Sequence, residues 1–302
     1  MDSLLIITKR NIKIFFKDKG FLLASLMTPI ILLVLYMTFL ANVYRDSFNS
    51  NLPDGVVISN TLINGTVAGQ LIASLLAVSA VTVSFCSNLL CVQDKANESL
   101  RDFMVSPYKP WKLAISYYLA SLFSTLLICY ITLGLSFVYL LILNGWYLSF
   151  GDVLLIILDI FILTNFGTVL SSIVNSFLKT QGQMSAVGTI VSSGYGFICG
   201  AYMPLSQFSP WLRNILMFLP GTYATSLIKN HSLVGVSSSL LDEGFPIEVV
   251  KGIRDSIDYN IYFFNHQVPV FAMYLVTIIS ISVLLIAYVF INVIKAKKAL
   301  RK

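Results

Sequence analysis

The stretch GAYMPLSQFSPWLRNILMFLPGTYATSLIKNH, residues 200–231, contains three closely spaced prolines. Pro204, Pro210 and Pro220 divide it into helical pieces of roughly ten residues, because proline cannot continue a helix interior. Such a piece is too short to cross the ~30 Å hydrocarbon core of a bilayer, which needs about 20 apolar residues. The stretch therefore predicts re-entrant or interfacial half-helices over residues 203–230.

Composition excludes an ordinary soluble domain. Of the 302 residues, 57% are hydrophobic and only 11% are charged, whereas soluble domains carry about 25% charged residues. A soluble fold could not bury that much apolar surface, so we predict one all-α, polytopic membrane domain over residues 1–302. The net charge of +6 does not indicate a nucleic-acid partner, because the basic residues flank apolar segments rather than gather on one surface.

Six apolar segments are long enough to cross a bilayer. They cover residues 21–43, 67–92, 113–143, 153–174, 184–202 and 268–294. A seventh crossing, by residues 203–230, would put the two basic tails of the chain on opposite faces of the membrane. We therefore predict six transmembrane helices, with the half-helices placed before the last one.

Basic residues predict the orientation. The N-terminal tail, residues 93–112, the loop after the fourth span and the C-terminal tail hold 15 of the 20 lysines and arginines. Because basic residues accumulate in cytoplasmic loops, we expect a multi-pass protein of a bacterial plasma membrane with both termini in the cytoplasm. Residues 231–267 are then predicted as a polar extracellular loop, within which Pro246 opens a short helix.

Residues 1–19 carry a regular basic pattern before the first span. Lys9, Lys13 and Lys17 recur every fourth residue, with apolar residues largely on the opposite side. This pattern predicts an amphipathic helix that lies in the headgroup layer. An ordinary basic anchor explains the same residues equally well.

The stretch ESLRDFMVSPYKPWK, residues 98–112, predicts a short helix within the cytoplasmic loop 93–112. Asn97 is a suitable N-cap, and Pro107 ends the helix. The chain contains no G-x-x-x-x-G-K-[ST] phosphate loop, so it lacks that means of hydrolysing ATP. A charged cytoplasmic helix on such a chain predicts that a separate, energy-supplying protein binds there. On this helix Leu100, Phe103 and Met104 would share one face, with the charged residues Glu98, Arg101 and Asp102 displayed beside them.

Common catalytic and metal-binding motifs are missing from the sequence. It contains no H-E-x-x-H, G-x-S-x-G or C-x-x-C pattern, so we predict neither an enzyme nor a cofactor bound by this chain. His231 and His266 fall in the predicted extracellular loop. We interpret them as polar loop residues rather than metal ligands.

Small residues recur at helical spacing in two of the predicted spans. They are Gly188, Ser192, Gly196 and Gly200 in the fifth span and, as a weaker pattern near Gln70, Ala73, Ser74 and Ala77 in the second. Small side chains let helix backbones approach closely in lipid, where packing drives association. The pattern predicts a close helix interface, with ordinary packing inside the chain as the alternative.

Asp159 is the single clear ionisable residue within a predicted span. Because charge in lipid is costly, such residues often mark ion or proton pathways. Two interpretations stay open from the sequence. Asp159 is either a functional group of an ion-coupled transporter or channel, or a carboxylate that pairs with a neighbour or faces a wet cleft.

Three stretches resemble the ABC-2 type permeases, the membrane subunits of ATP-binding-cassette exporters. Residues 8–36 resemble the family's amphipathic helix and first span, and residues 98–121 resemble its coupling helix. Residues 200–228 resemble the signature before the last span and are the most specific match. The matching residues there are Gly200, Pro204, Leu205, Pro210, Trp211, Leu212, Pro220 and Tyr223.

The resemblance implies two permeases, identical or related, each resting on a separately encoded ATPase that binds ATP and Mg. It implies that the second and fifth spans line the dimer interface and the substrate path. The residues implied to contact the ATPase are Glu98, Leu100, Arg101, Asp102, Phe103, Met104, Ser106 and Pro107. The residues implied to form an extracellular gate are Pro204, Pro210, Trp211, Pro220 and Tyr223.

A coupling-like helix without a phosphate loop leads us to expect the permease subunit of an ATP-driven exporter. Its expected cargo is amphiphilic, such as a drug, a hydrophobic peptide or a lipid-linked molecule, and its partners are the ATPase, a second permease and membrane lipid. Ion-coupled transport through Asp159 is one alternative. A non-transporting peptide-sensing or immunity subunit is another, because a fold does not fix a function.

Overall fold

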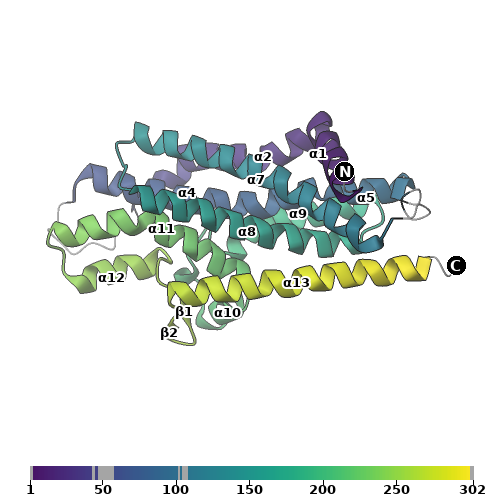
Figure 1. Ribbon diagram of the computed structural model, residues 1–302. Helices are drawn as coiled ribbons and strands as arrows, with labels where there is room; N and C mark the ends of the chain where they lie inside the picture. The colour runs from purple at the N-terminus through teal and green to yellow at the C-terminus, as the bar shows by residue number, and fades with distance from the viewer. Residues whose placement is uncertain (1–2, 43–44, 47–57, 101–102, 104–107, 300–302) are drawn as a thin grey trace.

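The computed structural model describes residues 3–42, 45–46, 58–100, 103 and 108–299. Nearly all of the long helices run along one axis, and both chain ends lie at the same end of the molecule (Figure 1). The described chain is therefore all-α apart from one small hairpin, as its composition predicts.

The first half of the chain forms long helices. Helix α1 (Ser3–Lys17) precedes helix α2 (Lys19–Leu35), which continues as the π-helical turn η1 (Tyr36–Leu40). Helix α4 (Asn60–Ser87) leads almost directly into α5 (Leu89–Ala96), followed by α7 (Pro110–Ile142) and α8 (Phe150–Phe177).

The second half contains shorter elements between two long helices. These elements are α9 (Gln181–Ile198), the 3-10 turn η2 (Leu205–Gln207), α10 (Pro210–Leu216), α11 (Pro220–Asp242) and α12 (Ile247–Ser256). An antiparallel hairpin of β1 (Tyr262–Phe263) and β2 (His266–Gln267) then leads into α13 (Val270–Ala299).

Five helical stretches of the described chain are long and apolar enough to cross a membrane. They are Lys19–Leu40, Asn60–Ala96, Pro110–Ile142, Phe150–Phe177 and Val270–Lys297, and they coincide with five of the six predicted spans. The chain is thus an all-α, multi-pass membrane protein. The remaining predicted span, residues 184–202, forms α9, which is rich in Gly and Ser and is not among the five. A crossing by α9 stays a prediction.

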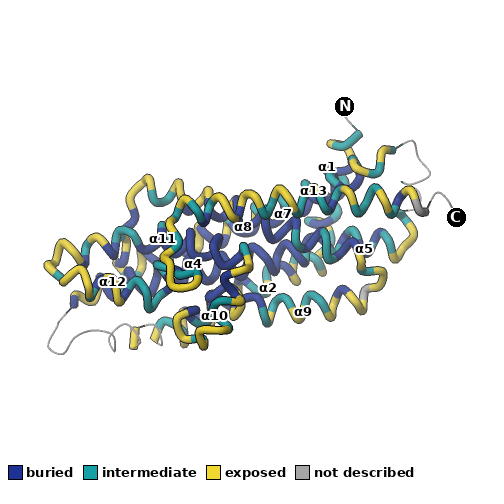
Figure 2. The backbone as a smooth tube through the Cα atoms, turned by 90° about the horizontal axis from the view of Figure 1, so that it is seen from below, coloured by how far each residue is buried: buried dark blue, intermediate teal, exposed yellow. Residues whose placement is uncertain are grey.

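Helix α4 is the centre of the molecule. It contacts α2, α7, α8, α9 and α11, and nearly every residue from Leu62 to Phe85 is buried (Figure 2). A helix without a charged face is expected to be surrounded by other helices. Gly69 allows the close approach of α11, because a Cβ there would lie 2.8 Å from the carbonyl oxygen of Ser232.

Residues 3–17 of the N-terminal segment predicted as an amphipathic helix form α1, and the position of this helix in the headgroup layer stays a prediction. Lys9, Lys13 and Lys17 are exposed, whereas Asn11 and Phe15 are buried. Helix α1 packs mainly against α7. Its basic residues are exposed as the pattern predicts, but Leu5 and Ile6 are exposed as well.

The structure corrects the boundary predicted at residue 231. Residues 231–267 do not begin as a loop, because α11 continues through this position to Asp242. Val236 and Leu240 are buried with apolar residues of α12 and the start of α4, so this helix is held by protein contacts that hydropathy does not report. The short helix predicted after Pro246 is confirmed as α12.

Candidate functional site

An ionic cluster joins α1, α5 and α7 near the end of the molecule that carries both chain termini (Figure 1). The Arg10 guanidinium donates to the Asp94 carboxylate, with Nη1 2.6 Å from Oδ2. Tyr117 donates its hydroxyl to the same oxygen at 2.5 Å. Asp94 is only 6% exposed, so its charge depends on these donors. The hydrogen bond to Asp94 also raises the pKa of Arg10 above its ordinary value, so the guanidinium stays positively charged.

The predicted coupling segment packs beside this cluster. Leu100 and Phe103 pack against apolar residues of α1, α5 and α7, and the Arg10 guanidinium carbon lies 5.5 Å from the centre of the Phe103 ring. Arg10 therefore contacts both α5 and the coupling segment. Of the other predicted contact residues, the structure describes Glu98, whose backbone is in the left-handed region with a φ of 61°. Those outside the described residues are Arg101, Asp102, Met104, Ser106 and Pro107.

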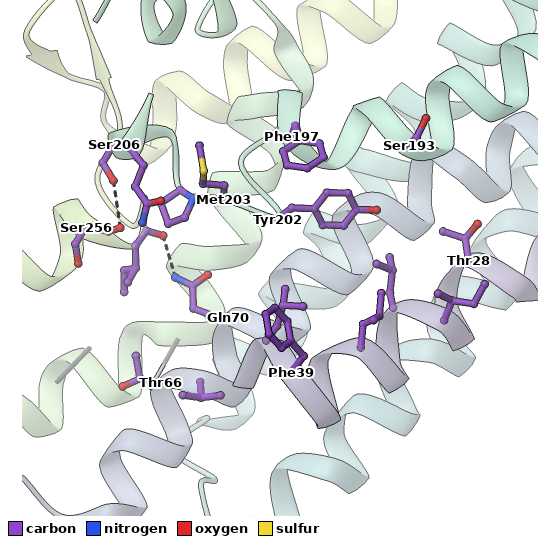
Figure 3. A pocket seen from close by; sticks show the side chains of 18 of the residues that line it. Thr28, Phe39, Thr66, Gln70, Ser193, Phe197, Tyr202, Met203, Ser206 and Ser256 are labelled. Atoms are coloured by element: carbon purple, nitrogen blue, oxygen red, sulfur yellow. Dashed lines mark hydrogen bonds between the residues drawn. The ribbon is translucent and has the colours of Figure 1, made fainter. Parts of the chain in front are cut away.

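A cavity of about 1020 Å³ lies between α2, α4 and α9. Residues 202–204, 206–207 and 255–257 complete its wall. Ser206 and Ser256 lie together at one end of the cavity, away from Thr28 (Figure 3). The cavity is thus built from two spans, from α9, from the segment that follows α9 and from the end of α12.

The lining of this cavity combines apolar surface with polar groups, which include the Asp255 carboxylate at one end. Aliphatic side chains of α2 and the rings of Phe39, Phe197 and Tyr202 supply apolar wall. The polar groups are mainly hydroxyls, together with Gln70, whose Nε2 donates to the carbonyl oxygen of Ile257 at 2.9 Å. Its Oε1 has no partner in the part of the chain that the structure describes. A mostly apolar wall with a few polar groups is typical of a ligand site.

The four small residues of the fifth predicted span separate into two pairs. Ser192 lines the cavity, and a Cβ built at Gly188 would meet no described atom within 4 Å. A Cβ at Gly196, by contrast, would lie 2.3 Å from the Tyr202 ring. Gly200 is buried, with a φ of +72°, in the turn that ends α9. Only the first pair is accessible to a second copy of the chain.

The small residues of the second predicted span are enclosed. Ala73, Ser74 and Ala77 are 0% exposed within the core of this chain, so they cannot contact a second permease. Their predicted place at a dimer interface is wrong, and packing within the chain explains them. Gln70 does line the cavity. Small residues suit a packed core and a helix interface equally, so their spacing could not distinguish the two.

The predicted gate residues surround the junction of α9, α10 and α11. Pro210 and Pro220 occupy the first turns of α10 and α11, where a missing N–H is tolerated. Tyr223 donates its hydroxyl to a backbone carbonyl at the end of α10 at 2.6 Å, and Pro204 lines the cavity. Trp211 is 66% exposed. The structure brings these residues to one region without showing movement there.

A second buried ion pair, which sequence reasoning missed, holds this junction. Lys229 Nζ lies 3.0 Å from Asp258 Oδ2 and donates to the carbonyl oxygen of Gly200 at 2.8 Å. Asp258 also accepts the backbone N–H groups of Leu205 and Ser206. The pair ties α11 to the end of α9, to η2 and to the turn after α12. A lone lysine within a run of apolar and hydroxyl residues was the available signal.

Asp159 on α8 is buried and paired. His231 Nδ1 lies 2.6 Å from Asp159 Oδ2, and Tyr274 donates its hydroxyl to Oδ1 at 2.5 Å. Helices α8, α11 and α13 meet at this cluster. The geometry supports the interpretation of Asp159 as a carboxylate paired with a neighbour. Among the residues described, no group of three potential ligands could hold a metal ion.

The fold and the cavity define a class, the multi-pass α-helical membrane proteins with a cavity of ligand size. Comparison with protein families then specifies the family. The model of the ABC-2 type transporters matches residues 2–230, so the chain belongs to this family. It is a membrane permease subunit of an ABC transporter, and the family implies association with an ATP-binding subunit. A search of curated proteins found no match.

Proposed function

We propose that this chain is the permease of an ATP-driven exporter whose amphiphilic cargo passes through the cavity between α2, α4 and α9. The observation that carries the proposal is the mixed lining of that space of about 1020 Å³. Sites for drug-sized ligands span about 300–1,000 Å³, so the cavity suits a molecule rather than an ion. Drugs, hydrophobic peptides and lipid-linked molecules share the required chemistry.

In this proposal, a separate ATPase binds the coupling segment, and its movements are transmitted from there to the cavity. Arg10 joins that segment to α5 through Phe103 and Asp94. Helix α5 follows α4 with one residue between them, and Thr66, Val67 and Gln70 of α4 line the cavity. A displacement of the coupling segment therefore has a continuous helical route to the cargo.

We further propose six crossings, with α9 as the fifth and a re-entrant segment made by α10 and the start of α11. A Cβ at Gly221 would approach Tyr195 of α9 and Phe166 of α8. Tyr195 lies in the last turn of α9, so the chain returns to the end of α9 before α11 begins. Backbone at membrane depth must be sheltered by protein or a water-filled cavity, and these helices supply the shelter for an outer gate.

A second permease is proposed to face the open side of α9. Gly188 leaves space at this surface, and the neighbouring exposed residues include Ser185, Thr189, Ile190 and Ser193. Small residues on a helix allow close association in lipid. Either an identical or a related permease meets this requirement.

The test fills the cavity without altering the coupling segment. Leu35 lines the cavity, whereas its neighbour Val34 on α2 does not, and both are partly exposed, at 43% and 53%. In proteoliposomes with the partner ATPase, we expect Leu35→Trp to lower ATP-dependent transport of an amphiphile about tenfold or more. Val34→Trp should transport like the wild type. Equal transport by the two variants would contradict the assignment of the cavity.

A further inference from the structure

A smaller cavity of about 170 Å³ adjoins the large one. We call it the annex. Ser206 and Asp255 line both spaces, and Ser206 marks the end of the large cavity that lies away from Thr28 (Figure 3). The annex is walled by η2, α10, the end of α12 and β1. Its volume is several times the ~30 Å³ that one water occupies in the liquid, so it has room for a polar head group.

Arg213 of α10 supplies the positive charge of the annex. Its guanidinium has no hydrogen-bond or ion-pair partner within the described residues, and its Nε is shielded from solvent. A guanidinium presents five donors in a planar fork that matches a carboxylate or a phosphate. Leaving the shielded Nε–H without an acceptor is unfavourable. The side chain therefore points to a ligand that brings the acceptors.

The two carboxylates of the annex, Asp255 and Asp258, have different partners. Asp258 is paired with Lys229. Asp255 accepts hydrogen bonds from Asn260 Nδ2 at 2.7 Å and from the Tyr262 hydroxyl at 3.1 Å, but none of the described residues gives it a cationic partner. Burial and the Asp255 carboxylate both raise the pKa of Tyr262 above its ordinary value, so the phenol remains a donor.

Arg213 and Asp255 thus offer opposite charges to one small space, and no ion pair joins them in the described structure. A purely anionic guest would gain from Arg213 but would meet the carboxylate of Asp255. A purely cationic guest would meet the converse penalty. A guest that carries both charges forms a charge-assisted hydrogen bond at each site.

We propose that the annex binds the head group of the transported amphiphile and that this head group is a zwitterion. Its phosphate or carboxylate contacts Arg213, and its primary ammonium contacts Asp255. The apolar part lies in the large cavity, beside Phe197 and Tyr202. The cargo's route rests on the proposed export function, whereas binding to the annex is measurable without the ATPase. Aminophospholipids and amphiphilic amino acids both carry this chemistry.

The first experiment compares head groups on one tail. Purified full-length protein in a nonionic detergent is titrated calorimetrically with dodecyl phosphate, dodecylamine, dodecyl phosphoethanolamine and S-dodecylcysteine. We expect at least one of the two zwitterionic probes to bind about tenfold or more tightly than either singly charged probe. The tighter zwitterion shows whether phosphate or carboxylate is the preferred anion. Equal affinities for all four probes would overturn the proposal.

Variants then assign the two charges. Arg213→Gln should weaken binding of the preferred zwitterion about tenfold or more, and Arg213→Lys should restore part of it. Asp255→Asn should weaken zwitterion binding but strengthen binding of dodecyl phosphate, because the repelling carboxylate is gone. Lys251→Gln is the control, since Lys251 is exposed on α12 and lines neither cavity. Unchanged head-group preference in both annex variants would overturn the assignment.

Measurements of melting temperature and of ATP-driven transport distinguish failure of the annex proposal from failure of the proposed export function. The Arg213 side chain makes no polar contact within the described residues, so Arg213→Gln should keep the melting temperature of the wild type and report on binding alone. Selective binding without ATP-driven transport would support the annex and contradict the export function. Transport with unselective binding would support export and overturn the annex.

Discussion

Two buried ion pairs hold different regions of this permease, and they are built differently. Arg10–Asp94 joins α1 to α5 beside the coupling segment, and the Arg10 side chain is 33% exposed. Lys229–Asp258 lies in the region of α9 to α12, and its side chains are only 2% and 5% exposed. A partly exposed guanidinium can regain water when its partner is removed, whereas an enclosed ammonium cannot.

Asp94 and Asp258 also differ in how freely their partners can move. Asp94 is held by two side chains, Arg10 and Tyr117, which can change rotamer. Asp258 is held by Lys229 and by two backbone N–H groups, which move only with the chain. The contrast indicates that the first region is suited to rearrangement during coupling, and the second to holding the wall of the cavity in place.

The strongest consequence is expected for the enclosed pair. Asp258→Asn removes the negative charge that compensates the enclosed Lys229 ammonium and leaves it with uncharged acceptors such as the carbonyl oxygen of Gly200, so the free energy of unfolding should fall by about 3–5 kcal/mol. Denaturant unfolding in detergent measures the change. Asp242→Asn, at the exposed end of α11, should change it by less than about 0.5 kcal/mol. A loss below about 1 kcal/mol in Asp258→Asn would remove the contrast.

A smaller loss of stability, with a clear loss of coupling, is expected at the partly exposed pair. Asp94→Asn removes the charge that holds Arg10, so the free energy of unfolding should fall by about 1–3 kcal/mol. Cargo-stimulated ATP hydrolysis by the partner ATPase should fall about tenfold, because α1 and the coupling segment lose a shared contact with α5. Lys13→Gln, exposed on α1, is the matched control. Normal stimulation in Asp94→Asn would make the cluster purely structural.

The mildest effect is expected at the third buried carboxylate. Asp159→Asn keeps an acceptor for the Tyr274 hydroxyl or for His231, so ATP-driven transport should change by less than about twofold. An uncoupler should have no effect while ATP is present. Flux measurements in proteoliposomes test both statements. Transport that stops in this variant, or that a membrane gradient drives without ATP, would favour the ion-coupled alternative.

The sequence predictions are accurate where a feature depends on residues close together in the chain, and they fail where it depends on contacts between distant helices. The spans predicted at 113–143 and 153–174 correspond to α7 and α8 with shifts of at most three residues at each end, because an apolar run and its own helical hydrogen bonds are local. The sequence does not predict the part of α11 past residue 231, since polar residues there, such as Ser232 and Ser237, are buried against protein. The spacing of Ala73 and Ala77 was read as a possible interface, although α7, α8 and α11 enclose this part of the molecule.

Local chemistry was therefore sufficient to predict a helical membrane chain, most of its spans, its N-terminal amphipathic helix and the proline-divided segment before the last span. It could not identify which polar groups meet. Arg10 and Asp94 are 84 residues apart in the chain, and Asp159 and His231 are 72 apart. Such pairs depend on how distant helices pack, and so do the cavity and the annex, because no residue's own neighbours determine what will lie opposite it.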